Sequence, residues 1–277
     1  MASPVPPARL SVILARDAHT AVVLRRGPSK VVGTFGWNRS DDTFTAGQWL
    51  KGRIYEHSCD LSPDGKYFLY FAYNGQGHTE TKGSWTAVSF APYLKAISIW
   101  GNGSAWSGGG LFLDNRRYWV RHWGGHLLIR STTYASKLTL VDAGALEELQ
   151  PGITSHYLHR VRDGWERVQI PKSRCDIFEK SLPHGWRIRR LHGAGGPLMS
   201  DLARRGTQHD EYRLVSPDAE AAFPDWSWAD WDHIQNRLVW ASRGKLFAAS
   251  VTPSGLGEAK ELYDFNRAEF QPIEAPY

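Results

Sequence analysis

The acidic and aromatic segment FPDWSWADWD, residues 223–232, holds the densest set of side chains that could do chemistry. Glycoside hydrolysis needs two carboxylates roughly 5 to 10 Å apart, one of them with a raised pKa. Asp225, Asp230 and Asp232 supply candidate carboxylates, and Trp226 supplies a face on which a sugar ring can stack. The alternative is structural, because acidic and aromatic residues also occur where ordinary strands begin.

A second candidate set consists of tryptophans and an arginine that lie outside the apolar runs, and it suits recognition rather than catalysis. Trp and Arg are over-represented at binding hot spots because they bury a large area at modest entropic cost. They also stack on sugars and bases, and Arg pairs with carboxylates or phosphates. The structural alternative is that most of these indoles pack in the core. The residues predicted to lie in loops or at strand ends are Trp49, Arg53, Trp85, Trp106, Trp226 and Trp228.

Two pairs of histidines have spacings that bear on metal binding. His156 and His159 are three residues apart in a predicted strand, so their side chains point to opposite faces. His122 and His126 flank a glycine pair in a predicted loop, but no Asp, Glu or Cys lies close by in the sequence. We therefore predict no metal site.

Nucleophilic and phosphate-binding motifs are incomplete. No Gly-x-Ser-x-Gly elbow occurs. His57 lies two residues before Cys59, on one face of a predicted strand, where such a pair can activate a thiolate; coincidence is the alternative. The glycine-rich runs 108–110 and 193–196 are not followed by Lys-Ser/Thr and a helix. We predict no catalytic residue and no cofactor.

Turn signals between β-rich runs organise the chain. In HSCDLSPDGKYFLYFAY, residues 57–73, Pro63 presets φ, Asp64 can bond its own backbone, and Gly65 accepts a positive φ. Further turns are predicted at Asp114-Asn115, Asp163-Gly164, Gln235-Asn236 and Arg243-Gly244. The first three turns lie about fifty residues apart, a period that suits one four-stranded propeller blade.

The hairpin at 57–73 resembles the strand–Asp-x-Ser-Pro-Asp-Gly-Lys–strand signature of TolB-like, WD-type β-propeller repeats. This resemblance implies an all-β propeller that acts as a rigid interaction platform. We expect five four-stranded blades, in which Asp60 of the signature bonds a backbone turn. The N-terminal runs 10–16, 21–25 and 30–37 supply three strands of one blade, and Phe270–Ala275 supplies its missing innermost strand and closes the ring. Pro272 and Pro276 oppose that strand, because proline cannot donate to a ladder.

Length and composition are those of a globular protein that buries a full core. The chain has 277 residues, 42% of them hydrophobic and 22% charged, with 13 Trp. The isolated Cys59 and Cys175 exclude a disulfide framework and are compatible with a reducing compartment. The apolar run Leu10–Ala15 is too short for a signal peptide or a bilayer span. We interpret residues 1–8 as a Pro-rich arm and 9–277 as one propeller domain, with an insertion and a possible short helix at 194–210.

Together these features predict a non-catalytic, cytoplasmic propeller that binds a protein partner. We assign the contact to Trp49, Arg53, Trp85, Trp106 and Trp226, with His57 near the axis. The net charge of +5 permits an acidic partner, whereas the basic runs alternate poorly with aromatics, so nucleic acid is not expected. No membrane insertion is expected. The alternatives are a glycan-active hydrolase or lyase, or a sugar-binding lectin, that uses an axial pocket near Asp225 and Asp230.

Overall fold

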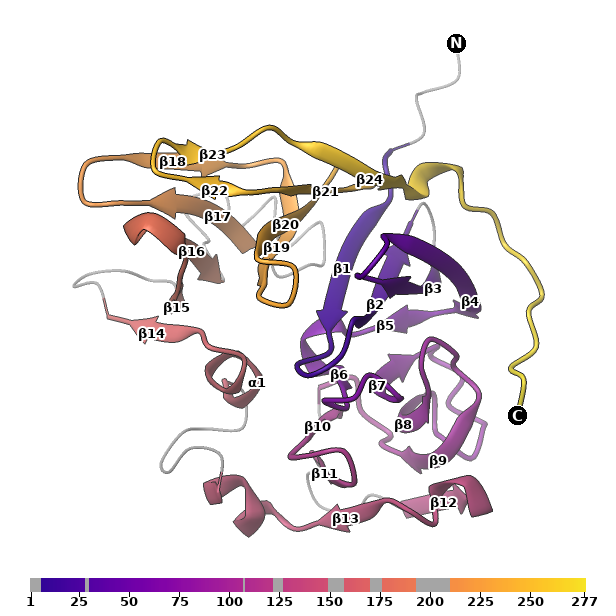
Figure 1. Ribbon diagram of the computed structural model, residues 1–277. Coiled ribbons are helices and arrows are strands. Elements are labelled where there is room, and N and C mark those ends of the chain that lie inside the picture. The colour runs from indigo at the N-terminus through magenta and orange to yellow at the C-terminus, as the bar shows by residue number, and fades with distance from the viewer. Residues whose placement is uncertain are drawn as a thin grey trace. The chain divides into compact units, whose positions relative to one another are not determined.

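The computed structural model describes residues 6–27, 30–106, 108–121, 127–148, 157–169, 176–192 and 210–277 (Figure 1). Its regular elements are almost all β-strands in several sheets, so the predicted all-β class is confirmed. Within the described residues the only α-helix is α1 (Leu158–Arg162), and it is too short to cross a membrane. The chain divides into two compact units: unit 1 is Met1–His159 with Arg267–Tyr277, and unit 2 is Arg160–Asn266.

Unit 1 begins with a four-stranded antiparallel meander in which each strand pairs with the next. The three predicted N-terminal runs are confirmed as its first three strands. The fourth was not predicted as a strand, although TFTAGQWLK begins with the alternation of polar and apolar residues that a half-buried strand shows. The strands are β1 (Arg9–Leu14), β2 (Thr20–Arg26), β3 (Val31–Asn38) and β4 (Thr43–Lys51).

The second sheet of unit 1 has the order β12-β9-β8-β7-β5, and β6 also pairs with β7. Its strand YFLYFAY, which has neighbours on both sides, is buried on both faces except at its last residue, which explains the nearly continuous apolar run. Its short helix η1 (Glu56–Ser58) precedes β6. The strands are β5 (Arg53–Ile54), β6 (Asp60–Leu61), β7 (Tyr67–Tyr73), β8 (Ser84–Phe90), β9 (Ala96–Gly101) and β12 (Leu127–Ser131).

The predicted Ser-Pro-Asp-Gly turn joins β6 to β7 as an antiparallel hairpin. The N–H of Ser62 donates to the carbonyl of Tyr67 over 2.9 Å, and Gly65 has a φ of 71°, which favours glycine. Asp60 is buried, and its Oδ2 accepts the N–H of Phe112 at 2.6 Å. Asp60 therefore bonds a backbone group, as predicted, but that group belongs to a strand residue and not to a turn, so Asp60 ties the hairpin to the next sheet.

That next sheet is small and has the order β10-β11-β13, with β11 and β13 parallel. The predicted turn at Asp114-Asn115 joins β10 to β11, and Asp114 Oδ1 accepts the N–H groups of Arg116 and Arg117, both at 2.8 Å. Short 3-10 helices flank β13. The elements are β10 (Gly110–Phe112), β11 (Arg117–Val120), η2 (Thr133–Ala135), β13 (Thr139–Val141) and η3 (Ala143–Glu148).

Tyr118 lies in the core beside this sheet and is 4% exposed, so we expect its ionisation to make the protein less stable at alkaline pH. Burial raises the pKa of Tyr118 to about 12, against the opposing effect of a hydrogen bond with Ser98. As the pH rises, the hydroxyl of Tyr118 loses its proton in the unfolded chain at about pH 10, before it does so in the folded protein. The free energy of unfolding therefore keeps its full value below about pH 10 and falls by roughly 2 to 3 kcal/mol toward pH 12. Urea unfolding across this range should show a smaller fall for Tyr118→Phe than for the wild type. An equal fall would contradict the prediction.

Unit 2 contains a five-stranded antiparallel meander, β14 to β18, a sheet of order β19-β20-β21-β24, and the hairpin β22-β23. The predicted turns at Gln235-Asn236 and Arg243-Gly244 join β19 to β20 and β20 to β21. Short helices η4 (Pro183–Gly185) and η5 (Phe265–Arg267) complete the elements. The strands are β14 (Glu166–Val168), β15 (Asp176–Ser181), β16 (Arg187–His192), β17 (Asp210–Val215), β18 (Glu220–Phe223), β19 (Trp226–Asp232), β20 (Arg237–Ser242), β21 (Lys245–Ala249), β22 (Val251–Thr252), β23 (Gly255–Leu256) and β24 (Lys260–Asp264).

Two local predictions were wrong. The run expected to form a strand through His159 is the helix α1, because Leu158 is 1% exposed and packs against Leu111 and Trp119. The segment Phe270–Ala275 forms no strand, and β4 completes the N-terminal sheet in its place. Its prolines give the physical reason, since they cannot donate to a ladder.

Several other sequence features lie outside the described residues. They are Cys175, the histidines His122, His126 and His156, the glycine run 193–196, and the predicted insertion except Asp210, which begins β17.

Candidate functional site

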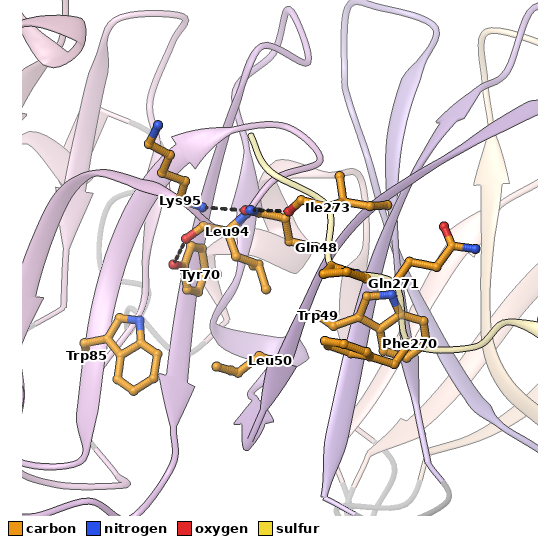
Figure 2. Close-up of a pocket in the computed structure, with 11 residues that line it drawn as sticks. Gln48, Trp49, Leu50, Tyr70, Trp85, Leu94, Lys95, Phe270, Gln271 and Ile273 are labelled. Atoms are coloured by element: carbon orange, nitrogen blue, oxygen red, sulfur yellow. Dashed lines mark hydrogen bonds between the residues drawn. The ribbon is translucent and has the colours of Figure 1, made fainter. Parts of the chain in front are cut away.

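A pocket of about 280 Å³ lies beside β4 in unit 1 (Figure 2). Its walls come from β4, β7, β8, the connection between β8 and β9, and the C-terminal segment. We call it the β4 pocket. The residues that line it are Gln48, Trp49, Leu50, Tyr70, Trp85, Leu94, Lys95, Phe270, Gln271, Pro272 and Ile273.

Gln48 holds three walls of the β4 pocket together. Its Oε1 accepts the N–H groups of Leu94 at 2.8 Å and Lys95 at 2.9 Å. Its Nε2 donates to the carbonyl of Ile273 at 2.9 Å, a bond visible in Figure 2. Three of the four hydrogen-bonding positions of this amide are thereby used within the protein. Gln48 is a structural clamp with little polar capacity left for a ligand.

Trp49 forms a preorganised aromatic wall. Its indole packs edge-on against Phe35 with ring centroids 6.0 Å apart, and the guanidinium of Arg25 lies 5.6 Å from its ring. A Cβ on Gly33 would lie 3.0 Å from the ring, a contact so tight that the indole would have to shift to accommodate it. Phe270 lies 6.3 Å from Trp49 and remains 66% exposed. The pocket therefore combines a fixed indole with an exposed phenyl ring.

The titratable side chains that line the β4 pocket are Tyr70 and Lys95. Burial raises the pKa of Tyr70, and its hydroxyl donates to the carbonyl of Leu94 at 2.6 Å. The Lys95 ammonium donates to the backbone oxygen of Tyr277 and lies 5.3 Å from that ring. The described lining includes no carboxylate, imidazole or thiol. It thus lacks the acid–base pair or activated nucleophile that most hydrolytic chemistry uses.

Tyr277 anchors the far end of the C-terminal wall. Its hydroxyl donates to the carbonyl of Lys95 at 2.5 Å and accepts the N–H of Phe90 at 3.2 Å. Its ring packs edge-on against Phe90, at 4.7 Å, and Tyr134, at 5.7 Å. With the Gln48–Ile273 bond, these contacts hold the segment at two points, which keeps it in place without a ladder.

The structure brings two of the sequence-predicted site residues, Trp49 and Trp85, into the β4 pocket. Trp85 lies near the start of β8, in agreement with the predicted strand end, whereas Trp49 lies within β4, which was not predicted as a strand. The other candidates of unit 1 do not line the pocket. Arg53 lies on β5 with its guanidinium 4.5 Å from the ring of Tyr55, His57 lies in η1, and Trp106 is 93% exposed.

The acidic candidates of unit 2 each form an ion pair. Asp225 pairs with Arg243 at 2.7 Å on an exposed surface, and Asp230 pairs with Lys180 at 2.5 Å. The third, Asp232, is fully buried at the β19–β20 hairpin, 3.3 Å from Arg237. These pairings support the structural interpretation of the acidic segment, because each carboxylate already has a cation.

Trp226 lies at a strand end, which is one of the two kinds of position predicted for it, but its side chain is buried. It is the first residue of β19 and is 6% exposed, and Trp228 is 7% exposed. The Trp226 ring stacks between Phe223 at 4.0 Å and Trp240 at 5.0 Å. Both indoles therefore pack in the core, which was the structural alternative to a binding role.

Sequence reasoning missed Gln48, Tyr70 and the C-terminal residues of the β4 pocket. Gln48 stands beside the predicted Trp49, but nothing local marks its amide as a clamp. Phe270 carried a signal, since it is a large apolar residue between polar and proline positions. Phe270 and Trp49 are separated by most of the chain in the sequence, so no local pattern indicates their contact.

Comparisons with known proteins assign neither a family nor a function to this pocket. No family model matches the sequence, and no curated protein matches it. Among solved structures, an uncharacterized protein from Listeria monocytogenes EGD-e aligns with 8% identity and a TM-score of 0.26. The alignment covers 91% of this chain and 66% of that one. A likeness at this TM-score carries no argument about function.

Proposed function

We propose that this protein is a non-catalytic interaction module whose β4 pocket receives an apolar side chain of a protein partner. The observation that carries this proposal is an aromatic-walled pocket whose described lining holds no acid–base pair or nucleophile. Its volume of about 280 Å³ is just below the range of about 300 to 1,000 Å³ of small-molecule sites. Such a volume suits one large side chain.

The polar groups around the pocket favour a peptide over a sugar. A sugar presents many hydroxyls, and each needs a partner when it is buried. The Gln48 amide is largely used by the protein, and the Tyr70 hydroxyl donates to a backbone carbonyl. The surfaces left for a ligand are mainly those of Trp49, Trp85 and Phe270. Aromatic surface of this kind is typical of hot spots in protein interfaces.

In this proposal the antiparallel sheets are blades of a TolB-like, WD-type propeller, and the propeller is the platform that presents the pocket. The Ser-Pro-Asp-Gly hairpin and the four-stranded meander β1 to β4 support this architecture. A cytoplasmic location belongs to the same proposal, supported by the free, buried Cys59. A glycan ligand is the competing occupant of the pocket.

A capture experiment with matched variants tests the proposal. The tagged full chain is compared with Trp85→Ala, and with Trp106→Ala as a control that removes an exposed indole outside the pocket. We expect a stoichiometric protein partner that survives high salt with the wild type and the control. Loss of a hot-spot indole costs about 2 kcal/mol or more, so Trp85→Ala should weaken binding roughly thirtyfold.

The contradicting outcomes are distinct. Equal capture by Trp85→Ala, folded as judged by circular dichroism, would remove the β4 pocket from the interface. Loss with Trp106→Ala alone would move the interface to the loop that carries this residue. Binding to a glycan array that Trp85→Ala abolishes would replace the protein partner with a sugar.

A further inference from the structure

The C-terminal segment, residues 268–277, contacts the rest of unit 1 in the manner of a bound peptide. It forms no strand, so no backbone ladder holds it in place. The carbonyl of Ile273 accepts from the amide of Gln48, and the hydroxyl of Tyr277 donates to the carbonyl of Lys95. Most of the residues before the last three are exposed. The segment is therefore held by a few side-chain contacts near its middle and at its end.

The surface that receives the segment is shaped by contacts of its own. Oε1 of Gln48 accepts the N–H of Leu94 at 2.8 Å, which orients the amide and leaves its Nε2 for the segment. Phe90, which packs against the ring of the last residue, stacks on Tyr67 at 5.3 Å and meets Tyr134 edge-on at 5.9 Å. None of these supporting contacts involves the segment. A surface fixed in this way loses little conformational freedom when a peptide docks on it.

The segment is also restricted before it docks. Pro272 and Pro276 fix φ at about −65°, and Gln271 and Ala275, which precede them, favour extended conformations. A peptide that is already extended loses less entropy on docking than an unrestricted chain does. Extended, proline-containing peptides are also the kind that aromatic-lined grooves bind. The segment therefore has the properties of a separate peptide ligand.

A short connection joins this ligand to unit 2. Phe265 has no exposed surface, and Nδ2 of Asn266 donates to the carbonyl of Arg243 at 2.9 Å, so both residues are fixed within unit 2. Ala268 and Glu269 follow, and they belong to no helix or strand. Backbone rotation at these two residues can release the segment without breaking the strand pairing of either unit.

We propose that the C-terminal segment is exchanged between two copies of the chain, so that the segment of one copy docks on unit 1 of the other. The occupant is a second copy because this peptide fits this surface, and every copy carries both. Exchange keeps the contacts described above and is a low-cost route to a dimer. Phe270 and Ile273 of each β4 pocket then come from the other copy. The inference does not depend on what the pocket binds.

Docking within one copy competes with exchange. A tethered segment has a high effective concentration at its own surface, so the exchanged dimer should form only as the protein concentration rises. Variants that spoil docking within each copy, but not between copies, should shift this balance toward the dimer.

Complementation between two full-length variants tests the exchange. Tyr277→Ala spoils the segment and leaves the surface intact. Tyr134→Ala removes from the surface a half-exposed ring, 5.7 Å from that of Tyr277, and leaves the segment intact. Loss of a hot-spot aromatic weakens docking roughly thirtyfold. We therefore expect the mixture to form a heterodimer, measured by light scattering after size-exclusion chromatography, at concentrations where each variant alone is monomeric.

Tyr73→Ala is the matched control for Tyr134→Ala, because Tyr73 is another exposed tyrosine of unit 1 and takes part in none of the contacts described above. Mixed with Tyr277→Ala, it should dimerise no more than the wild type does. If Tyr134→Ala does not fold by circular dichroism, Gln48→Ala takes its place. A mixture of folded variants with the molar mass of the separate chains at every concentration would overturn the proposal. A heterodimer that persists when both copies carry Tyr277→Ala would do the same.

Discussion

Asp210→Asn should lower the free energy of unfolding of unit 2 by about 3 to 5 kcal/mol, the usual cost of removing one partner from a buried ion pair. Asp210 is 4% exposed, and its two carboxylate oxygens serve different neighbours. Oδ2 accepts from Nη2 of Arg190 at 2.6 Å, and Oδ1 lies 2.7 Å from Nδ1 of His192. Asparagine keeps the shape but removes the charge, so Arg190 would remain buried beside a neutral amide.

The protonation of Arg190 shows how strongly this carboxylate acts. Burial would lower the pKa of Arg190, yet Asp210 and Tyr212 more than offset that effect and the net direction is upward. The buried guanidinium therefore stays charged, and loss of its partner exposes the full cost of desolvation.

Asp225→Asn is the matched control, because Asp225 forms an ion pair with Arg243 in which both side chains are more than half exposed. Exposed pairs of this kind contribute about 0 to 1 kcal/mol. Urea unfolding of the two variants, followed by far-ultraviolet circular dichroism, should separate them clearly. Similar, small losses in both would show that the Arg190–Asp210 pair does not stabilise unit 2.

In unit 1 the largest expected effect belongs to Phe68→Ala, at about 3 to 5 kcal/mol of unfolding free energy. Phe68 has no exposed surface and lies on β7, which pairs with β8 on one side and with β5 and β6 on the other. It packs in a core with Leu24, Ile54 and Leu61, and its ring centroid lies 5.5 Å from that of Tyr70. Truncation would leave a cavity between the two larger sheets of unit 1, and a packed interior fills such a space only partly.

Chemical unfolding with Leu127→Ala as the control measures this effect. Leu127 lies on β12 and is 74% exposed, so its truncation should change stability by about 0.5 kcal/mol or less. Stability of Phe68→Ala within 1 kcal/mol of the wild type would contradict the packing described for β7.

The local sequence determined the all-β class, the first three N-terminal strands and the hairpin turns. Pro63, Asp64 and Gly65 specify their turn through preset φ, a side-chain bond to the backbone and tolerance of a positive φ. These features depend on neighbours within a few residues, and such neighbours are visible in the sequence.

Tertiary context overrode local pattern at three places. Burial of Leu158 against unit 1 core residues accompanies a helical turn where a strand was predicted. Trp226 was assigned to a binding face, yet its ring is buried and stacks between Phe223 and Trp240. The C-terminal segment contains apolar residues suited to a strand, but its prolines leave it held by the Gln48 amide and the ring of Tyr277.

The candidate site shows most clearly the difference between what the local sequence determines and what the tertiary structure decides. The sequence by itself identified Trp49 and Trp85 as residues suited to recognition, because their type and surroundings indicate it. Only the tertiary structure placed both in one pocket and brought Phe270 against Trp49. The physical reason is that residue chemistry is local, whereas a site requires side chains from distant segments to converge, and strand pairing and packing decide that convergence.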